Sequence, residues 1–204
     1  MASWIELVVL FVVCPLGFLF SPFRIPKIPA LLLMTLLCLA LLLRDKGFSR
    51  KALWHREPLR GYIKNILFRA AFVGPALLMM VWFIDPDTLF NFPRTRPALW
   101  AIVMVLYPLL SAYPQELIYR FFFFRRYRSL FKTESRMIWA STLAFAFLHI
   151  IFLNPLAVLL TIPGGYLLST TYIRTQSLLV ASIEHAVYGN LVFTIGLGFY
   201  FYRG

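Results

Sequence analysis

Residues 99–124 read LWAIVMVLYPLLSAYPQELIYRFFFF, an apolar run that carries an acid and a base near its end. A helix needs about 20 apolar residues to cross a bilayer, and this run is longer than that. Glu116 and Arg120 interrupt it, although a charged side chain at the middle of a membrane costs roughly 2.5–3.5 kcal/mol on insertion scales. Charges retained at that cost usually face the interior of a helical bundle. The run therefore predicts a membrane-spanning helix that carries a functional site.

The composition of the whole chain indicates the same class. Of its 204 residues 61% are hydrophobic and 18% aromatic, and the mean hydropathy is +0.78. A soluble domain of this length does not need so much apolar surface. We therefore predict an all-α polytopic transmembrane helical bundle, with residues 1–204 forming a single integral membrane domain in the lipid bilayer. The net charge of +12 does not indicate nucleic acid, because the basic residues cluster between apolar segments.

The apolar runs predict seven helices, or eight if the last run breaks near Gly189. They cover roughly residues 4–20, 28–43, 66–84, 99–124, 137–153, 155–173 and 178–202. The loops at 44–64 and 120–136 hold seven and six Lys or Arg residues, whereas the alternate loops near 24–27 and 94–96 hold two each. Basic loops stay in the cytoplasm by the positive-inside rule, which predicts a cytoplasmic N-terminus.

Three of these helices carry the polar residues of a candidate site. Glu116 and Arg120 are four residues apart, so they share a helix face and can pair. His149 interrupts the next run, one turn after Phe145. Glu116 and His149 are about equally far from the turn near residues 131–134, so in an antiparallel hairpin they should lie at the same depth. Taken alone, each feature also fits an ordinary ion pair or a histidine bonded to a neighbouring helix.

The last run contributes a second histidine. It contains Glu184, His185, Gly189 and Asn190, and His185 lies within reach of the depth of the other two motifs. Glu184 faces another direction from His185, so we expect it to support a neighbouring helix. Gly189 allows either a bend or a close contact between helices.

These residue types permit hydrolytic chemistry. A carboxylate and an imidazole around a water molecule form a general base, and a second imidazole with an amide can stabilise an oxyanion. Glu116, His149 and His185 could instead bind a divalent metal such as zinc. The HExxH spacing is absent, so a metal is not favoured, and no other cofactor is predicted.

In their order and spacing these residues resemble the CPBP family of intramembrane proteases, the group of the type II CAAX prenyl proteases and the Abi proteins. The family pattern is EExxxR, then FxxxH, then HxxxN or HxxxD. The matching residues here are Gln115-Glu116-xxx-Arg120, Phe145-xxx-His149 and His185-xxx-Gly189-Asn190. The resemblance covers residues 99–202, which it marks as a protease-like core.

The resemblance implies roles for individual residues. Glu116 and His149 would activate water, and His185 with Asn190 would hold the oxyanion. Arg120 would keep the Glu116 carboxylate in one rotamer. The substrate would be a membrane-associated or lipidated, CAAX-like peptide cleaved on the cytoplasmic side. The location would be the inner (plasma) membrane of a prokaryote, and no oligomeric state is predicted.

Two positions depart from the family pattern. Gln115 stands where the first glutamate is expected, and a glutamine cannot act as a general base. Gly189 stands where Asn or Asp is expected, with Asn190 one place later. Two alternatives to a protease therefore stay open, namely a catalytically silent membrane scaffold or chaperone and a small transporter that uses the same polar cavity.

Overall fold

The computed structural model describes residues 3–23 and 25–201. Arg24 of the predicted 24–27 loop and residue 202, the predicted end of the last run, lie outside the described residues. Within the described ranges all regular elements are helices and no strand is present. The predicted all-α class is confirmed.

In the described part of the chain, seven apolar helical segments stand where seven were predicted. Five are long and apolar enough to cross a membrane, namely Leu59–Ile84, Pro97–Leu130, Glu134–Phe152, Pro155–Thr175 and Leu178–Ile195. Two are shorter apolar helices, Trp4–Leu19 and Lys27–Leu43. Several helices begin or end at other residues than predicted, because polar turns extend them beyond their apolar runs. The segment predicted to begin at residue 66, for example, begins at Leu59.

The first segment is one continuous helix in three pieces, and a hairpin turn leads from it to α3 (Lys27–Leu43). The pieces are α1 (Trp4–Val8), a π-helical stretch (Val9–Val13) and α2 (Cys14–Leu19). Glu6, an acid in this apolar segment, is paired rather than free. Its carboxylate accepts hydrogen bonds from Arg126 Nε and Nη2, both at 2.8 Å, and from the Tyr127 hydroxyl at 3.0 Å. This bidentate pair fixes the start of the chain to the end of the central helix.

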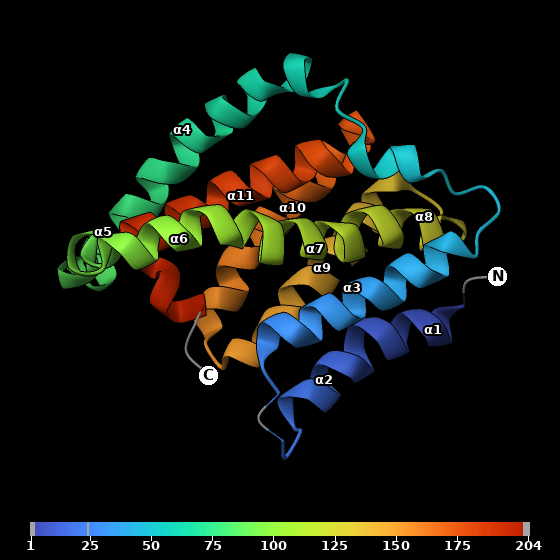
Figure 1. The fold of residues 1–204 in the computed structure, drawn as a ribbon, viewed down its shortest axis with the longest axis horizontal. Coiled ribbons are helices and arrows are strands. Elements are labelled where there is room, and N and C mark those ends of the chain that lie inside the picture. The colour runs from blue at the N-terminus through green and yellow to red at the C-terminus, as the bar shows by residue number, and fades with distance from the viewer. Residues whose placement is uncertain (1–2, 24, 202–204) are drawn as a thin grey trace.

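The central helix runs through the middle of the bundle (Figure 1). It consists of α6 (Pro97–Tyr107), a π-helical turn (Pro108–Ala112), α7 (Tyr113–Glu116), a π-helical stretch (Leu117–Phe122), α8 (Phe123–Tyr127) and a 3₁₀ turn (Arg128–Leu130). Pro108 and Pro114 have no N–H to donate to the preceding turn, so the helix widens around them. Gln115 and Glu116 lie on the short regular piece between the two widened stretches.

The last three spans are α9, α10 and α11, joined by short turns. Their bounds are Glu134–Leu148, Pro155–Thr175 and Leu178–Ile195, with 3₁₀ turns at His149–Phe152 and Leu197–Phe201. Each begins at a side-chain cap, because Thr133, Asn154 and Ser177 accept hydrogen bonds from backbone N–H groups of the first turn.

The proposed break at Gly189 does not occur. α11 continues through Gly189 and ends at Gly196, whose φ of 130° is readily adopted by glycine. A side chain at Gly196 would also meet the carbonyl oxygen of Thr88, 2.3 Å from the Cβ position. The last run is therefore not divided at Gly189, since its helix ends seven residues later, at Gly196.

α4 (Leu59–Ile84) lies at one edge of the bundle and contacts α11 (Figure 1). A 3₁₀ turn at Arg50–Trp54 precedes it, and a 3₁₀ turn at Pro86–Thr88 and α5 (Asn91–Thr95) follow it. The predicted 44–64 loop thus contains a short 3₁₀ turn and the first turns of α4.

The two ends of the bundle differ. At the end with the basic loops, Arg125 of α8 pairs with Asp45 at 2.9 Å. Beneath these loops lies a cluster that we call the aromatic plug, in which every member is at most 6% exposed: Phe121, Phe122, Phe123, Phe124 and Tyr127. The opposite end carries the turns after α2, α4 and α9. The side chains described next lie between the aromatic plug and this second end.

Candidate active site

Glu116 and Arg120 form the predicted pair. Both are fully buried, and Arg120 Nε lies 3.4 Å from Glu116 Oε2, although not in hydrogen-bonding geometry. Arg120 Nη2 donates to the carbonyl oxygen of Gly165 at 3.2 Å, and its guanidinium lies 4.6 Å from the centre of the Phe145 ring. Arg120 is thus held from two other helices and keeps a positive charge beside the Glu116 carboxylate.

Glu116 forms its hydrogen bond with His185. His185 Nδ1 lies 2.9 Å from Glu116 Oε1. A carboxylate only accepts, so Nδ1 carries the proton and the neutral ring keeps its lone pair on Nε2. The sequence predicted that Glu116 would act with His149, whereas the structure joins it to the histidine of α11.

His149 is oriented by its own helix. Its Nδ1 donates to the carbonyl oxygen of Phe145 at 2.8 Å, where α9 tightens into a 3₁₀ turn and leaves that carbonyl free. The spacing Phe145-xxx-His149 therefore has a local cause. The Phe145 ring touches both histidines, with ring centres 4.7 Å from His149 and 5.6 Å from His185. It packs in a T-shaped arrangement against each imidazole.

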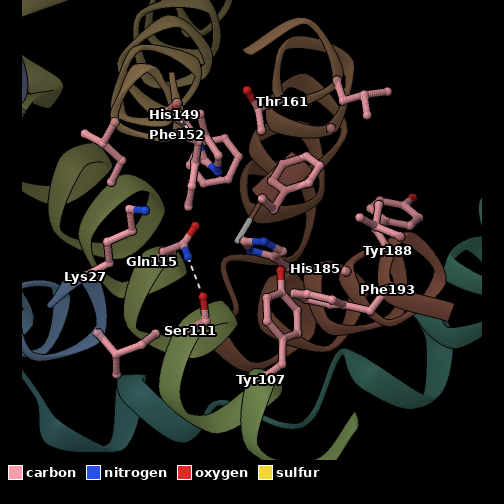
Figure 2. A pocket seen from close by; sticks show the side chains of 18 of the residues that line it. Lys27, Tyr107, Ser111, Gln115, His149, Phe152, Thr161, His185, Tyr188 and Phe193 are labelled. Carbon is pink, nitrogen blue, oxygen red and sulfur yellow. Dashed lines mark hydrogen bonds between the residues drawn. The ribbon is translucent and has the colours of Figure 1, made fainter. Parts of the chain in front are cut away.

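These side chains border a cavity of about 1310 Å³. Figure 2 shows Gln115, His149 and His185 directed into the same space from three helices. Glu116 does not line the cavity, because it lies behind His185. Gln115 does line it. Its Nε2 donates to Ser111 Oγ at 2.7 Å, and its buried Oε1 has no hydrogen-bond partner among the described residues.

Asn190 does not join the other motif residues. Its Nδ2 donates to the carbonyl oxygen of Met104 at 3.3 Å, and it does not line the cavity. On an unbroken helix Asn190 is turned by about 100° from Gly189, and this rotation directs it at α6. A bend at Gly189 was needed to bring it to His185, and α11 has none there.

Tyr107 of α6 lies in the site, and the sequence analysis missed it. It lines the cavity, and its ring packs against His185 with centres 6.0 Å apart. Gly189 makes room for it, since a Cβ there would lie 2.1 Å from Tyr107 Cε1. The available signal was a tyrosine two helical turns before Gln115 in an otherwise apolar run.

Glu184 belongs to a separate polar cluster behind α11. Its Oε1 accepts hydrogen bonds from Arg69 Nη1 at 3.0 Å and from the Tyr188 hydroxyl at 2.6 Å, and its Oε2 accepts one from the Thr171 hydroxyl. These partners come from α4, α10 and α11. The expected role of Glu184, supporting another helix, agrees with these contacts.

The predicted metal set fits the geometry poorly. In the described part of the chain, no three His, Cys, Asp or Glu side chains are grouped so that they could hold an ion. The Glu116 carboxylate faces His185 and Arg120, so a metal in the cavity would meet two imidazole nitrogens and no carboxylate.

Part of this chain matches a known protein family. The family described as type II CAAX prenyl endopeptidase Rce1-like matches residues 97–192, which run from the start of α6 to the last turns of α11. The match includes all the motif residues and slightly less than half of the chain. Neither the curated proteins nor the solved structures give a match.

Proposed function

Because residues 97–192 match the Rce1-like family of type II CAAX prenyl endopeptidases, we propose that this chain is an intramembrane peptidase. It hydrolyses a peptide bond in a membrane-associated or lipidated, CAAX-like substrate. The observation that carries the proposal is the hydrogen bond between Glu116 and His185 at the wall of the cavity. It leaves a basic imidazole nitrogen facing a space that is large enough for a peptide.

His185 is the general base of the proposed reaction. Its Nε2 takes a proton from a water molecule as the water oxygen attacks the peptide carbonyl carbon. The Glu116 carboxylate, accepting from Nδ1, holds the ring in the required tautomer and stabilises the imidazolium that forms. Arg120 keeps Glu116 in place. Glu116 and Arg120 are therefore positioning residues in this proposal.

Gln115 orients the attacking water. It cannot accept the proton, but its unpartnered Oε1 can accept a hydrogen bond from the water while Ser111 holds its amide group. Collapse of the tetrahedral intermediate breaks the C–N bond. The leaving nitrogen takes its proton from the His185 imidazolium, which restores the base. His149, with its Nδ1 proton bound to Phe145, offers Nε2 as an acceptor that positions the substrate on the other side of the cavity.

Two histidine substitutions test this proposal. The protein is reconstituted in liposomes with a quenched fluorescent peptide that carries a prenylated cysteine in a CAAX sequence. His185→Ala should reduce cleavage by roughly 10³-fold, since the general base is lost, and His149→Ala by roughly 10²-fold. His55→Ala, in the loop before α4, is the matched control and should keep the wild-type rate. Wild-type cleavage by the His185→Ala variant contradicts the mechanism.

A second function is favoured by Gln115. With an amide in place of the first acidic residue, the same cavity suits a catalytically silent relative that binds a membrane peptide as a scaffold or chaperone. A scaffold would bind the probe peptide without cutting it, and both histidine variants would retain binding. Measuring cleavage and peptide binding on the same samples separates the two functions.

A further inference from the structure

Gly189 and Tyr107 are complementary in shape across the α6–α11 contact. A Cβ at Gly189 would lie 2.1 Å from Tyr107 Cε1 and 2.4 Å from its hydroxyl oxygen, so any side chain there would displace the tyrosine. Gly189 stands one turn after His185 on the same helix face. The phenol therefore occupies the place on α11 where a side chain at position 189 would otherwise project.

We propose that the Tyr107 hydroxyl is the donor that stabilises the oxyanion of the tetrahedral intermediate. This role rests on the proposed peptidase function. Figure 2 shows the hydroxyl end of Tyr107 directed toward the His185 ring. The hydroxyl has no hydrogen-bond partner among the described residues, so it can donate to a substrate oxygen.

The geometry around Tyr107 favours this role over simple packing. Its ring is fixed at its edges by His185, at 6.0 Å between centres, and by Phe193, at 5.2 Å. A donor held in this way needs little reorganisation when charge develops, and the mostly apolar lining strengthens its hydrogen bond. Asn190, the donor expected from the sequence, is directed at Met104 instead.

The test compares cleavage of the prenylated CAAX peptide by wild-type and variant proteins. Tyr107→Phe removes only the hydroxyl and should lower kcat roughly 10²-fold with KM changed less than about threefold, as expected for loss of one oxyanion donor. Gly189→Ala should lower kcat similarly by displacing the tyrosine. In Tyr107→Ala, the second substitution Gly189→Asn should restore part of the lost rate by placing an amide in the vacated space. Tyr166→Phe, on the outer face of α10, is the control.

The outcomes separate two failures. A wild-type protein that cuts nothing overturns the peptidase function, and the role of Tyr107 with it. A wild type that cuts while Tyr107→Phe cuts equally well overturns only the role of Tyr107. A rise in KM with unchanged kcat also overturns it, because it would place the hydroxyl in ground-state binding.

A second observation, independent of Tyr107, concerns the end of the bundle at which the cavity opens. The cavity extends from His185 to the end of the bundle opposite the basic loops, where it reaches the surface at Phe23 and Leu153, which are 76% and 77% exposed. Toward the basic loops the aromatic plug closes the bundle, with Phe122, Phe123 and Tyr127 fully buried.

We infer that the substrate enters from the extracytoplasmic side. The positive-inside rule keeps the 44–64 and 120–136 loops in the cytoplasm, so the mouth of the cavity lies on the other face. The family resemblance had instead implied cleavage on the cytoplasmic side. An extracytoplasmic mouth selects peptides that are already translocated or that lie in the outer leaflet.

Thiol labelling tests the direction without needing turnover. Single cysteines at Leu153 and Thr161 report the mouth and the interior of the cavity, and a cysteine at Lys51 reports the basic loop, all in a Cys14→Ala, Cys38→Ala background. A membrane-impermeant maleimide should label Leu153→Cys and Thr161→Cys from outside intact cells and Lys51→Cys only in inverted vesicles. Labelling of Lys51→Cys from outside, or of the cavity positions only from the side of the basic loop, overturns the inference. Neither result affects the peptidase assay.

Discussion

Two glutamates of this protein, Glu116 and Glu184, are equally buried but accept different numbers of hydrogen bonds. Both are fully buried and both face an arginine. Glu184 accepts three hydrogen bonds from three side chains. Glu116 accepts one, and its Oε2 and Arg120 Nε and Nη1 have no hydrogen-bond partner among the described residues.

The two carboxylates therefore have different uses. A saturated carboxylate such as Glu184 has no capacity left for a substrate and serves to hold α4, α10 and α11 together. An undersatisfied pair stores unfavourable free energy, because buried polar groups without partners cost about 1–3 kcal/mol each. The Glu116 carboxylate, bonded to His185, would stabilise the imidazolium that forms in the proposed reaction.

The largest expected effect is the loss of activity in Glu116→Gln. The amide no longer stabilises an imidazolium at His185 and can hold the wrong tautomer, so kcat should fall roughly 10³–10⁴-fold. Cleavage of the prenylated CAAX peptide measures the effect. Glu57→Gln, in the exposed loop before α4, is the matched control. If Glu116→Gln keeps a tenth of the wild-type rate, Glu116 matters no more for catalysis than Glu184 is expected to. That result would contradict the different roles assigned to the two glutamates.

Glu184→Gln should do the reverse, with a large loss of stability and a modest loss of rate. Removing one partner of a buried, hydrogen-bonded ion pair leaves Arg69 uncompensated, which destabilises by about 3–5 kcal/mol. Thermal unfolding in detergent measures the stability, and kcat should stay within about tenfold of wild type. Replacing both partners, in Arg69→Met with Glu184→Leu, should recover much of the stability. No recovery in the double variant would contradict a purely structural cluster.

Gln115→Glu adds a third carboxylate to the two already compared, and this one faces the cavity. A carboxylate beside Ser111 can take the water proton directly, so we expect kcat to rise roughly tenfold. Gln176→Glu, at the end of α10, controls for the added charge. A fall in kcat would show that the neutral amide is required beside His185 and would favour water orientation as the whole role of Gln115.

The smallest effect concerns Asp45, an exposed acid paired with Arg125 outside the spans at 2.9 Å. The backbone N–H of Gly47 and then the Arg125 guanidinium lower the pKa of Asp45. A lowered pKa stabilises the fold above the ordinary value of about 3.9, and this contribution is lost as the pH falls through the lowered value. Asp45→Asn should therefore lower Tm slightly at about pH 7 and have no effect near pH 2. Asp87→Asn is the control, and a Tm difference that grows on acidification would contradict the assignment.

Much of the site was predictable because its residues lie at helical spacings. Glu116 and Arg120 pair because positions four apart share a helix face. His149 bonds to the carbonyl of Phe145 because that carbonyl lies one turn earlier on the same helix. The partner of His185 was not predictable in this way. The contact with Glu116 joins residues 69 positions apart, and it depends on how α11 is rotated against α7.

The class of the protein, its seven apolar helical segments and the burial of Glu116 and Arg120 could all be predicted from the order of residues along the chain. Hydrophobic runs and i,i+4 spacings are local properties, and a bilayer leaves the backbone little choice but a helix. Three features became visible only in the folded structure. Gln115 rather than Glu116 lines the cavity, and Glu116 forms a hydrogen bond with His185. Tyr107 packs against Gly189, where a side chain would not fit. These outcomes depend on helix rotation and close packing, where a turn of about 100° per residue moves a side chain from the cavity to a neighbouring helix.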